Sequence, residues 1–240
     1  MKKHFIFFDL GQTLVNEWNF IEYFDSIFLD TLNDFGSKID MRNYRAVRDN
    51  VIISRKIGQE EYIQELIIEV CKLISQPGYD RIIAKKLEPE IKKARRRLLR
   101  LFEDTIQTIS ILSKNYDLGI IANQSDDMLD LLKRSDINRF FKVNVISSEV
   151  KMKKPDLRIF LLAMDRAACK PEDCVMVGDR LDTDIHPANE LGMKTIRTTR
   201  SLFKLQTPRN ELEQPTHSVV DLSSIFDVVD KHYNIDNLFR

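Results

Sequence analysis

From about Thr105 onward, short apolar runs alternate with segments of helical periodicity. The expected strands cover residues 118–122, 143–147, 174–178, 194–198 and 217–220, and the helical segments cover 128–133, 158–167, a segment ending near Gly192, and 222–232. Strands that alternate with helices are joined by crossover connections and form a parallel sheet. The pattern therefore predicts a doubly wound, Rossmann-like α/β core.

A further strand is expected close to the N-terminus. Residues 5–8 read Phe-Ile-Phe-Phe and are followed by Asp9 and a loop that contains Gly11. A continuous apolar run is typical of a central parallel strand that is covered on both faces. Asp9 would then lie at the carboxyl end of that strand, where open α/β sheets bind ligands. A helix cap or a solvated loop carboxylate is the alternative at this position.

The segment between these strands has helical spacing throughout. Apolar residues recur at steps of three and four from Phe20 to Phe28, from Tyr62 to Ile74 and from Ile91 to Leu101. We expect an all-helical insert of three or four helices at residues 16–104, which interrupts a core formed by residues 1–15 and 105–240. Basic residues crowd the stretch 92–100, and on a helix they favour a solvated face over a binding site.

Bulk charge and cysteine content exclude some partners. The chain has 37 basic and 37 acidic residues among 240, so nothing in its net charge favours nucleic acid or an anionic membrane. The apolar run before Asp9 is too short for the core of a signal peptide. The three cysteines of the chain are not spaced as metal ligands are, and they suit reduced thiols. We expect a cytoplasmic protein that binds neither nucleic acid nor a membrane, and both a monomer and a homodimer remain open.

Two more strand ends carry polar residues, although each signal is weak alone. Asn123, Gln124 and Ser125 follow the strand that ends at Ala122. Their side chains and amides could hold an oxyanion at a helix start, or they could only cap that helix. Lys154 precedes Pro155 after the following strand, and a single lysine is usually solvated.

The acidic segment after residue 178 is a stronger signal. Asp179, Asp182 and Asp184 fall within six residues that follow an apolar strand. Carboxylates at this density repel one another unless an arginine or a divalent cation neutralises them, and Mg²⁺ is commonly bound by one or two carboxylates together with a substrate phosphate. The alternative is a solvated acidic loop.

Taken together, the strand ends resemble the motifs of the haloacid dehalogenase-like hydrolase superfamily. The motifs are, in chain order, Asp9, the polar cluster with Asn123, Lys154 before Pro155, and Asp179 with Asp184. The resemblance covers nearly the whole chain and extends to the subgroup whose helical cap lies between the first and second motifs. It implies a Mg²⁺-dependent phosphohydrolase that acts on small phosphorylated metabolites.

The resemblance also implies a role for each matching residue. Asp9 would be the nucleophile that forms an aspartyl-phosphate, and Lys154 would neutralise Asp9 and the phosphoryl oxygens. The substrate phosphate would be bound by Gly11, Ala122, Asn123, Gln124 and Lys154. The Mg²⁺ ion would be held by Asp9, the backbone carbonyl of Gly11, Asp179 and Asp184, with Asp182 as an additional candidate.

The chain departs from the family pattern at three positions. Gly11 occupies the place of a second aspartate that serves as general acid and base, and the loss of such a group costs about 10²–10⁴ in rate. Gln12 stands where glycine is usual, and Ala122 stands where the family has a hydroxyl residue. The proton could then come from water or from a cap carboxylate such as Glu17.

Two alternatives to a phosphatase follow from these departures. A 2-haloacid dehalogenase also lacks the second aspartate, because halide leaves without a proton, but it needs no metal, and the acidic segment 179–184 looks built for one. A catalytically silent ligand-binding protein would have no reason to keep four ionisable groups at clustered positions.

Overall fold

The fold is described from a computed structural model of the chain, which describes residues 4–57, 62–75, 77–124 and 126–233. Its contacts divide the chain into two units. The first unit, called the core here, contains residues 1–15, 101–204 and 208–240. The second, called the helical unit, contains residues 16–100 and 205–207.

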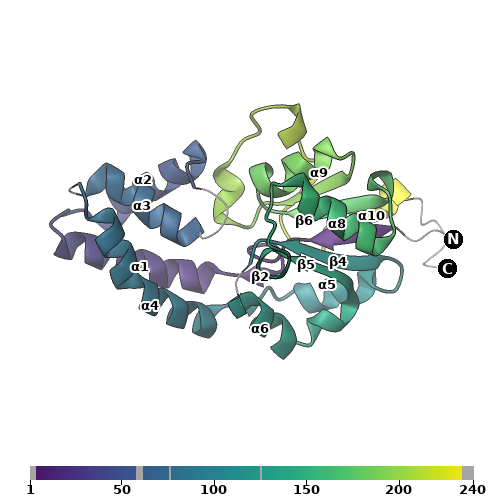
Figure 1. Cartoon of the computed structure of the whole chain (residues 1–240), viewed down its shortest axis with the longest axis horizontal. Helices are drawn as coiled ribbons and strands as arrows, with labels where there is room; N and C mark the ends of the chain where they lie inside the picture. The colour runs from purple at the N-terminus through teal and green to yellow at the C-terminus, as the bar shows by residue number, and fades with distance from the viewer. Residues whose placement is uncertain (1–3, 58–61, 76, 125, 234–240) are drawn as a thin grey trace. The chain divides into compact units, whose positions relative to one another are not determined.

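The core is built on a six-stranded sheet whose neighbours all pair in parallel (Figure 1). Its strands, in spatial order, are β5 (Phe141–Ile146), β4 (Asp117–Ala122), β1 (Phe5–Phe8), β6 (Cys174–Gly178), β7 (Lys194–Thr198) and β8 (His217–Val219). The predicted parallel α/β sheet is therefore confirmed. Because the chain runs outward from β1 in one direction through β5 and in the other through β8, the strand order reverses between β1 and β6.

Helices pack against the sheet through its apolar side chains. The helices of the core are α5 (Thr105–Leu112), α6 (Asp126–Arg134), α7 (Ser147–Val150), α8 (Leu157–Ala167), α9 (His186–Glu190) and α10 (Ile225–Tyr233). Phe7 and Met176 belong to a buried cluster with Phe160 of α8 and Ala188 of α9. Successive strand residues point to opposite faces. Burial of every residue of β1 and β6 agrees with strands that are covered on both sides.

Several predicted boundaries in the core were displaced. The strand expected at residues 143–147 begins at Phe141, which pairs with Leu118 of β4 ahead of a shift in register. It ends at Ile146, because Ser147 already begins α7. The last helix begins at Ile225 and not at residue 222.

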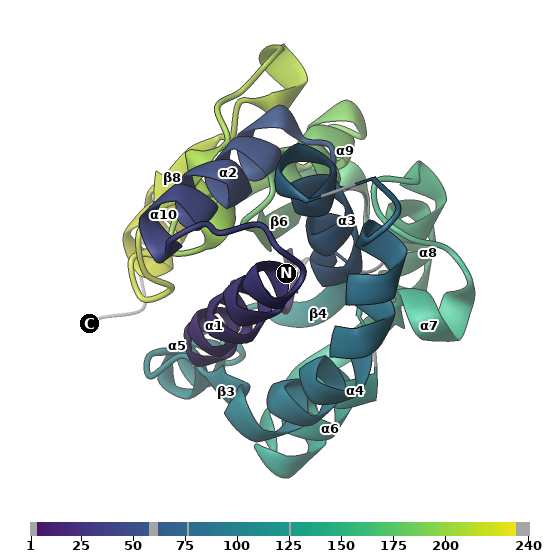
Figure 2. The same cartoon turned by 90° about the vertical axis from the view of Figure 1, so that its left-hand side faces the viewer.

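The described residues of the helical unit form four α-helices, which Figure 2 shows from one side. They are α1 (Trp18–Asp34), α2 (Met41–Ser54), α3 (Tyr62–Ile74) and α4 (Asp80–Leu98). The sequence patterns located three of them and missed α2, whose buried stripe includes the charged residue Arg48. Arg48 is buried because it pairs with Asp25 of α1. A buried ion pair breaks the apolar periodicity on which the prediction relied.

The chain passes between the units at two short strands, β2 (Val15–Asn16) and β3 (Arg100–Leu101), which form a two-stranded sheet. The segment 101–104 belongs to the core and not to the helical insert that we expected to extend to residue 104. The N–H of Phe102 donates to the carbonyl of Leu14 at 3.1 Å, and Asp104 pairs with Arg200 at 2.8 Å.

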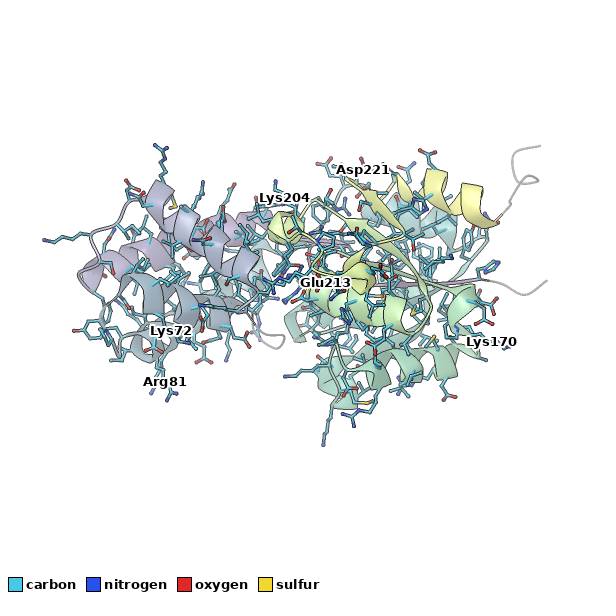
Figure 3. All side chains as sticks on the ribbon, turned by 90° about the horizontal axis from the view of Figure 1, so that it is seen from above. Lys72, Arg81, Lys170, Lys204, Glu213 and Asp221 are labelled. Carbon is cyan, nitrogen blue, oxygen red and sulfur yellow. The ribbon has the colours of Figure 1, made fainter. Side chains whose placement is uncertain are left out.

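The basic stretch at the end of α4 is mostly exposed, with one exception. Lys92, Lys93, Arg96 and Arg97 are exposed as predicted. Arg95 is not part of a solvated face, because its guanidinium lies 5.3 Å from the ring centroid of Phe20 and 3.5 Å from a carboxylate oxygen of Glu17. Within the described residues, no helix is long and apolar enough to cross a membrane. Charged side chains such as Lys72, Arg81 and Lys170 extend outward (Figure 3).

Candidate active site

Three buried carboxylates meet at the carboxyl ends of β1 and β6. Asp9 follows β1 directly, and its N–H continues the pairing of the strands by donating to the carbonyl of Val177 at 2.8 Å. Asp179 follows β6, and Asp184 lies in the π-helical turn Leu181–Ile185. One oxygen from each carboxylate lies within 4.8 Å of the others. The structure thus brings together residues that are up to 175 positions apart, at the point where the strand order reverses.

The turn after β6 holds Asp184 against the end of the strand. The backbone N–H of Arg180 donates to Oδ2 of Asp184 at 3.0 Å, and the N–H of Asp184 donates back to the carbonyl of Arg180 at 3.1 Å. Gly178 leaves room for this arrangement, because a Cβ at that position would overlap the side chain of Asp184. The close approach of the Asp184 carboxylate therefore requires glycine at this position.

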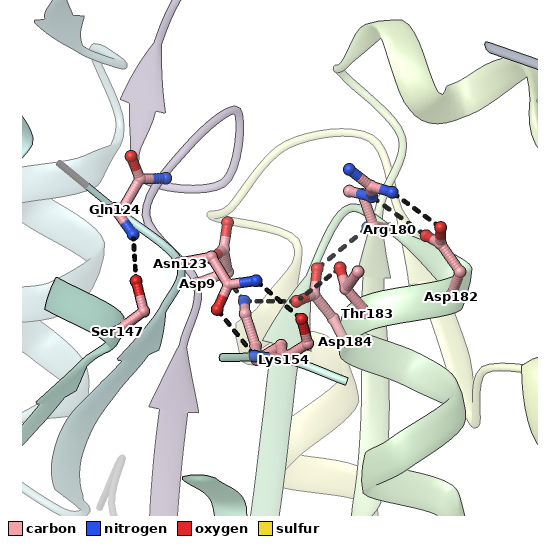
Figure 4. A network of polar contacts seen from close by, with 9 residues as sticks. All are labelled: Asp9, Asn123, Gln124, Ser147, Lys154, Arg180, Asp182, Thr183 and Asp184. Atoms are coloured by element: carbon pink, nitrogen blue, oxygen red, sulfur yellow. Dashed lines mark hydrogen bonds and ion pairs between the residues drawn. The ribbon is translucent and has the colours of Figure 1, made fainter. Parts of the chain in front are cut away.

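Lys154 lies between two of the carboxylates (Figure 4). Its Nζ is 2.6 Å from Oδ1 of Asp9 and 2.5 Å from Oδ1 of Asp184. The ammonium is buried, with 2% of the side chain exposed. A buried lysine in this position can neutralise an oxygen nucleophile and the charge that gathers on a transferring phosphoryl group.

Asn123 positions Lys154 through the backbone. Its Oδ1 accepts a hydrogen bond from the N–H of Lys154 at 2.8 Å, and its Nδ2 donates to the carbonyl of Lys154 at 2.8 Å. The two bonds tie the loop after β4 to the loop that carries the lysine. The direct contact between Asn123 and a phosphate that the family pattern implies remains a prediction.

The residues on either side of Asn123 make few polar contacts among the described residues. Ala122 is buried at the end of β4, opposite Ile146 of β5. The backbone N–H of Gln124 donates to Oγ of Ser147 at 3.2 Å. Ser125 lies outside the described residues. Phosphate binding by Gly11, Ala122 and Gln124 therefore stays a prediction.

The charges of the cluster shift the pKa values of its members. Burial raises the pKa of Asp9 to about 6, with the charge of Asp184 adding to this and Lys154 opposing it. Burial, followed by the charges of Asp184 and Asp9, raises the pKa of Asp179 well above its usual range. Burial opposes the charge of Lys154, but the two neighbouring carboxylates together raise its pKa. Three carboxylates facing one ammonium leave an excess of negative charge that a cation would relieve.

The donor set fits a divalent metal ion. Oδ2 of Asp179 is buried and has no hydrogen-bond partner among the described residues. Hard carboxylate oxygens are the ligands that Mg²⁺ prefers. Asp9, Asp179 and Asp184 are therefore the side chains that could hold such an ion, whereas the part predicted for the Gly11 carbonyl stays a prediction.

Asp182 and Glu17 each have a partner other than the three carboxylates and Lys154. Asp182 pairs with Arg180, its Oδ2 lying 2.7 Å from the guanidinium, and it is absent from the three-carboxylate cluster. Glu17, considered as a source of the missing proton, is buried and accepts a hydrogen bond from the hydroxyl of Tyr62 at 3.0 Å.

Sequence reasoning missed Arg197, which supports the loop that carries Asp179. This residue of β7 is buried, donates from Nε to the carbonyl of Asp179 at 3.3 Å, and also donates to the carbonyl of Phe203 at 2.6 Å. A charged residue within the otherwise uncharged part of a predicted buried strand was the signal that could have revealed it, because buried charges are rarely left without partners.

The sequence is similar to a known protein family and to individual relatives. The model described as haloacid dehalogenase-like hydrolase matches residues 6–198. A glyceraldehyde 3-phosphate phosphatase of Methanocaldococcus jannaschii is 29% identical over 227 residues, which cover 94% of this chain and 95% of the relative. One of Methanopyrus kandleri is 36% identical over 133 residues, which cover 55% of this chain and only 57% of the relative. An (S)-2-haloacid dehalogenase 4A of Burkholderia cepacia is 29% identical over 136 residues, covering 56% of this chain and 57% of the relative.

Solved structures share the fold over almost the full chain. A predicted phosphoglycolate phosphatase from Haemophilus somnus superposes with a TM-score of 0.71 at 17% identity, covering 95% of this chain and 99% of that one. At such low identity the likeness concerns the fold alone.

Proposed function

The chain belongs to the haloacid dehalogenase-like hydrolase family, and we propose that it is a Mg²⁺-dependent phosphohydrolase that acts on small phosphorylated metabolites through an aspartyl-phosphate on Asp9. One observation carries the proposal: the carboxylates of Asp9, Asp179 and Asp184 lie within 4.8 Å of one another, beside the ammonium of Lys154. That is an arrangement suited to a dianionic phosphoryl group and a divalent cation.

The first half of the reaction would be a displacement at phosphorus. A carboxylate oxygen of Asp9 attacks phosphorus, the bond from phosphorus to the leaving oxygen breaks, and the dephosphorylated product leaves as an alkoxide that takes a proton from water. A carboxylate nucleophile divides hydrolysis into two easier displacements. Gly11 offers no carboxyl to protonate the leaving group, so substrates with good leaving groups should react fastest.

Lys154 and the metal ligands would supply the electrostatic part of catalysis. Lys154 is held by Asn123 and faces Asp9, so its charge is in place before the phosphoryl group arrives. When bound, Mg²⁺ supplies positive charge that stabilises the phosphoryl oxygens. Positioning of charge in advance is the main contribution that a protein makes to phosphoryl transfer.

The first test is hydrolysis of para-nitrophenyl phosphate with Mg²⁺ and with a chelator, because this aryl phosphate needs little acid assistance. We expect release of phosphate only when Mg²⁺ is present. Glyceraldehyde 3-phosphate is the first metabolite to assay, since the relatives from Methanocaldococcus jannaschii and Methanopyrus kandleri are named as phosphatases of that compound.

The substitution Asp9→Asn tests whether the phosphatase activity comes from this site. Asparagine is nearly isosteric but is a poor nucleophile, so we expect a loss of at least about 10³-fold in kcat. Asp30→Asn, on the exposed side of α1, is the matched control and should keep the activity of the unmodified chain. Phosphate release by Asp9→Asn at the normal rate would remove Asp9 as nucleophile.

A parallel assay with 2-chloropropionate separates the dehalogenase alternative. That alternative has a specific basis, since Gly11 replaces the second aspartate and one relative is a 2-haloacid dehalogenase. Chloride release that is unaffected by the chelator, without phosphatase activity, would replace our proposal. Oδ2 of Asp179, which is buried and has no hydrogen-bond partner among the described residues, favours the metal-dependent reaction.

A further inference from the structure

The loop that follows β1 contains a buried carboxamide for which the described residues offer no partner. Gln12 is 2% exposed, and neither its Nε2 nor its Oε1 has a hydrogen-bond partner within that part of the chain. The same holds for Oγ1 of the adjacent Thr13. Buried polar groups in folded proteins are nearly always paired, so these atoms call for a ligand or a water molecule.

The backbone conformation of Gln12 is a second feature that lowers the stability of the folded state. Its φ is +57°, in the left-handed region that favours glycine. The loop is closed tightly around it, because the N–H of Gln12 donates to the carbonyl of Val15 at 2.8 Å and the N–H of Val15 donates to the carbonyl of Leu10 at 2.9 Å. Glycine at this position would avoid both the strain and the unpaired amide. A residue that carries two local costs beside a reactive carboxylate indicates a function.

The position of Gln12 matches a gap in the proposed chemistry. It lies three residues after Asp9 at the same strand end, and the intervening Gly11 has no side chain. Beside Asp9 the described cluster holds one ammonium and two further carboxylates, and the ammonium is already engaged by two of the three carboxylates. Nothing in that cluster is a neutral group that can both accept a hydrogen bond from water and donate one to a phosphoryl oxygen.

We infer that the carboxamide of Gln12 holds the water that hydrolyses the aspartyl-phosphate on Asp9. The inference rests on the proposed function and names a residue for the second half of the reaction, in which water hydrolyses the phosphoenzyme. Oε1 accepts a hydrogen bond from the water, and Nε2 donates to a phosphoryl oxygen. A glutamine that orients an attacking water is a known solution for phosphoryl transfer.

This step balances without a titrating side chain. The oxygen of the water bonds to phosphorus, and the bond between phosphorus and the carboxylate oxygen of Asp9 breaks. The two electrons of that bond stay on the carboxylate, which is restored as an anion. Both hydrogens of the water end on the released phosphate, as dihydrogen phosphate. Gln12 therefore orients the water but takes no proton.

The experiment is a rapid-mixing assay of para-nitrophenyl phosphate hydrolysis with Mg²⁺. The proteins are the unmodified chain, Gln12→Ala and Gln12→Gly, with Gln107→Ala on the exposed side of α5 as the matched control. Release of nitrophenol in the first turnover reports attack by Asp9, and the later steady rate reports hydrolysis of the phosphoenzyme. Mass spectrometry after an acid quench detects the phosphate on Asp9.

We expect both Gln12 variants to release about one nitrophenol per site rapidly and then to turn over about 10²-fold more slowly, the loss typical of one well-placed hydrogen-bonding group. Phosphate should accumulate on Asp9 in these variants, and Gln107→Ala should match the unmodified chain. Gln12→Gly separates function from folding, because glycine relieves the positive φ and should preserve or raise the melting temperature.

Two results would overturn the inference while leaving the proposed function intact. One is normal turnover by both Gln12 variants. The other is a slow first turnover with no phosphate on Asp9. That result would mean that Gln12 acts in the attack of Asp9 on the substrate or in the stability of the fold. Absence of phosphate release from the unmodified chain would instead overturn the proposed function, and the inference with it.

Discussion

At the scale of single residues, the site is governed by an imbalance of charge. The buried cluster contains three carboxylates and one ammonium group, which belongs to Lys154. Asp9 and Asp184 share it, and burial keeps water from screening their repulsion. Burial is the main cause of the raised pKa of Asp9, and the charge of Asp184 adds to it, although the ammonium of Lys154 lies 2.6 Å away and opposes both.

A pH dependence of stability follows for the protein without divalent cations. The pKa of Asp9 rises from 3.8 to about 6 on folding. A raised pKa means that the folded state binds the proton more tightly, so this contribution to stability is complete below pH 3.8 and is lost as the pH rises through about 6. The change in the free energy of unfolding is on the order of 3 kcal/mol.

The measurement compares urea unfolding of the unmodified chain and Asp9→Asn in a chelator across that pH range. The stability of the unmodified chain relative to the variant should fall as the pH rises. A constant difference would contradict the raised pKa.

The identities of the site residues were predictable, but their contacts were not. Asp9 and Asp179 directly follow apolar runs that short-range patterns reveal, and Lys154 and Asp184 lie in the segments that come after predicted strands. The bonds between Asn123 and the backbone of Lys154 join residues 31 positions apart. Only the paired sheet brings those two loops together, so a linear pattern cannot distinguish an amide that binds phosphate from one that positions a lysine.

At the scale of elements, the end of β6 and the turn after it act as one unit. Gly178 ends the strand, and Asp184 folds back on it from the π-helical turn. The sequence predicted the strand to its last residue, but a π-helical turn has no periodicity of its own over five residues. The packing of Asp184 on Gly178 therefore became visible only in the structure.

Gly178→Ala should disturb the site more than the fold. The new Cβ would force the carboxylate of Asp184 to move, at a cost of about 1–3 kcal/mol in stability. Because a 1 Å displacement can cost about 10²-fold in rate, we expect a loss of that size in phosphatase activity. Gly192→Ala is the control: its φ of +84° makes alanine costly, but it has open space around it and lies outside the cluster. Equal activity in the two variants, measured with para-nitrophenyl phosphate, would contradict the role of Gly178.

Within the helical unit, an aromatic stripe of α1 supplies much of the packing. The rings of Phe20, Phe24 and Phe28 follow one another, with centroids 6.3 and 5.4 Å apart, and Phe28 also meets Tyr44 of α2. The spacing of these residues predicted α1. It could not predict that the stripe meets α2, because the contact depends on how the helices pack.

Phe24→Ala should destabilise the protein strongly. The side chain is 1% exposed, and truncation of a buried phenylalanine costs about 3–5 kcal/mol through lost burial and the cavity that remains. Ile53→Ala on α2 is the control, since that side chain is 48% exposed and its loss should cost well under 1 kcal/mol. Urea unfolding measures both, and similar midpoints for the two variants would contradict the assignment of Phe24 to the core of the helical unit.

At the scale of the whole molecule, the candidate site joins segments that are remote in sequence. Asp9 directly follows the first strand, whereas Lys154, Asp179 and Asp184 come from two loops of the second half of the chain. An unfolded chain cannot gather these carboxylates, so a cation that binds them binds the folded state selectively. Binding should consequently appear as stability, without any measurement of turnover.

Addition of Mg²⁺ should raise the melting temperature of the unmodified chain. At a concentration 100 times the dissociation constant the gain is about 2.7 kcal/mol, which corresponds to roughly 5–10 °C for a domain of this size. Asp179→Asn should abolish most of the shift, because it removes the carboxylate whose Oδ2 the described residues leave unpaired. Asp182→Asn should retain the shift, since Asp182 pairs with Arg180 outside the cluster. Calorimetry on the three proteins gives the comparison, and an equal shift in Asp179→Asn would mean that Mg²⁺ binds elsewhere on the chain.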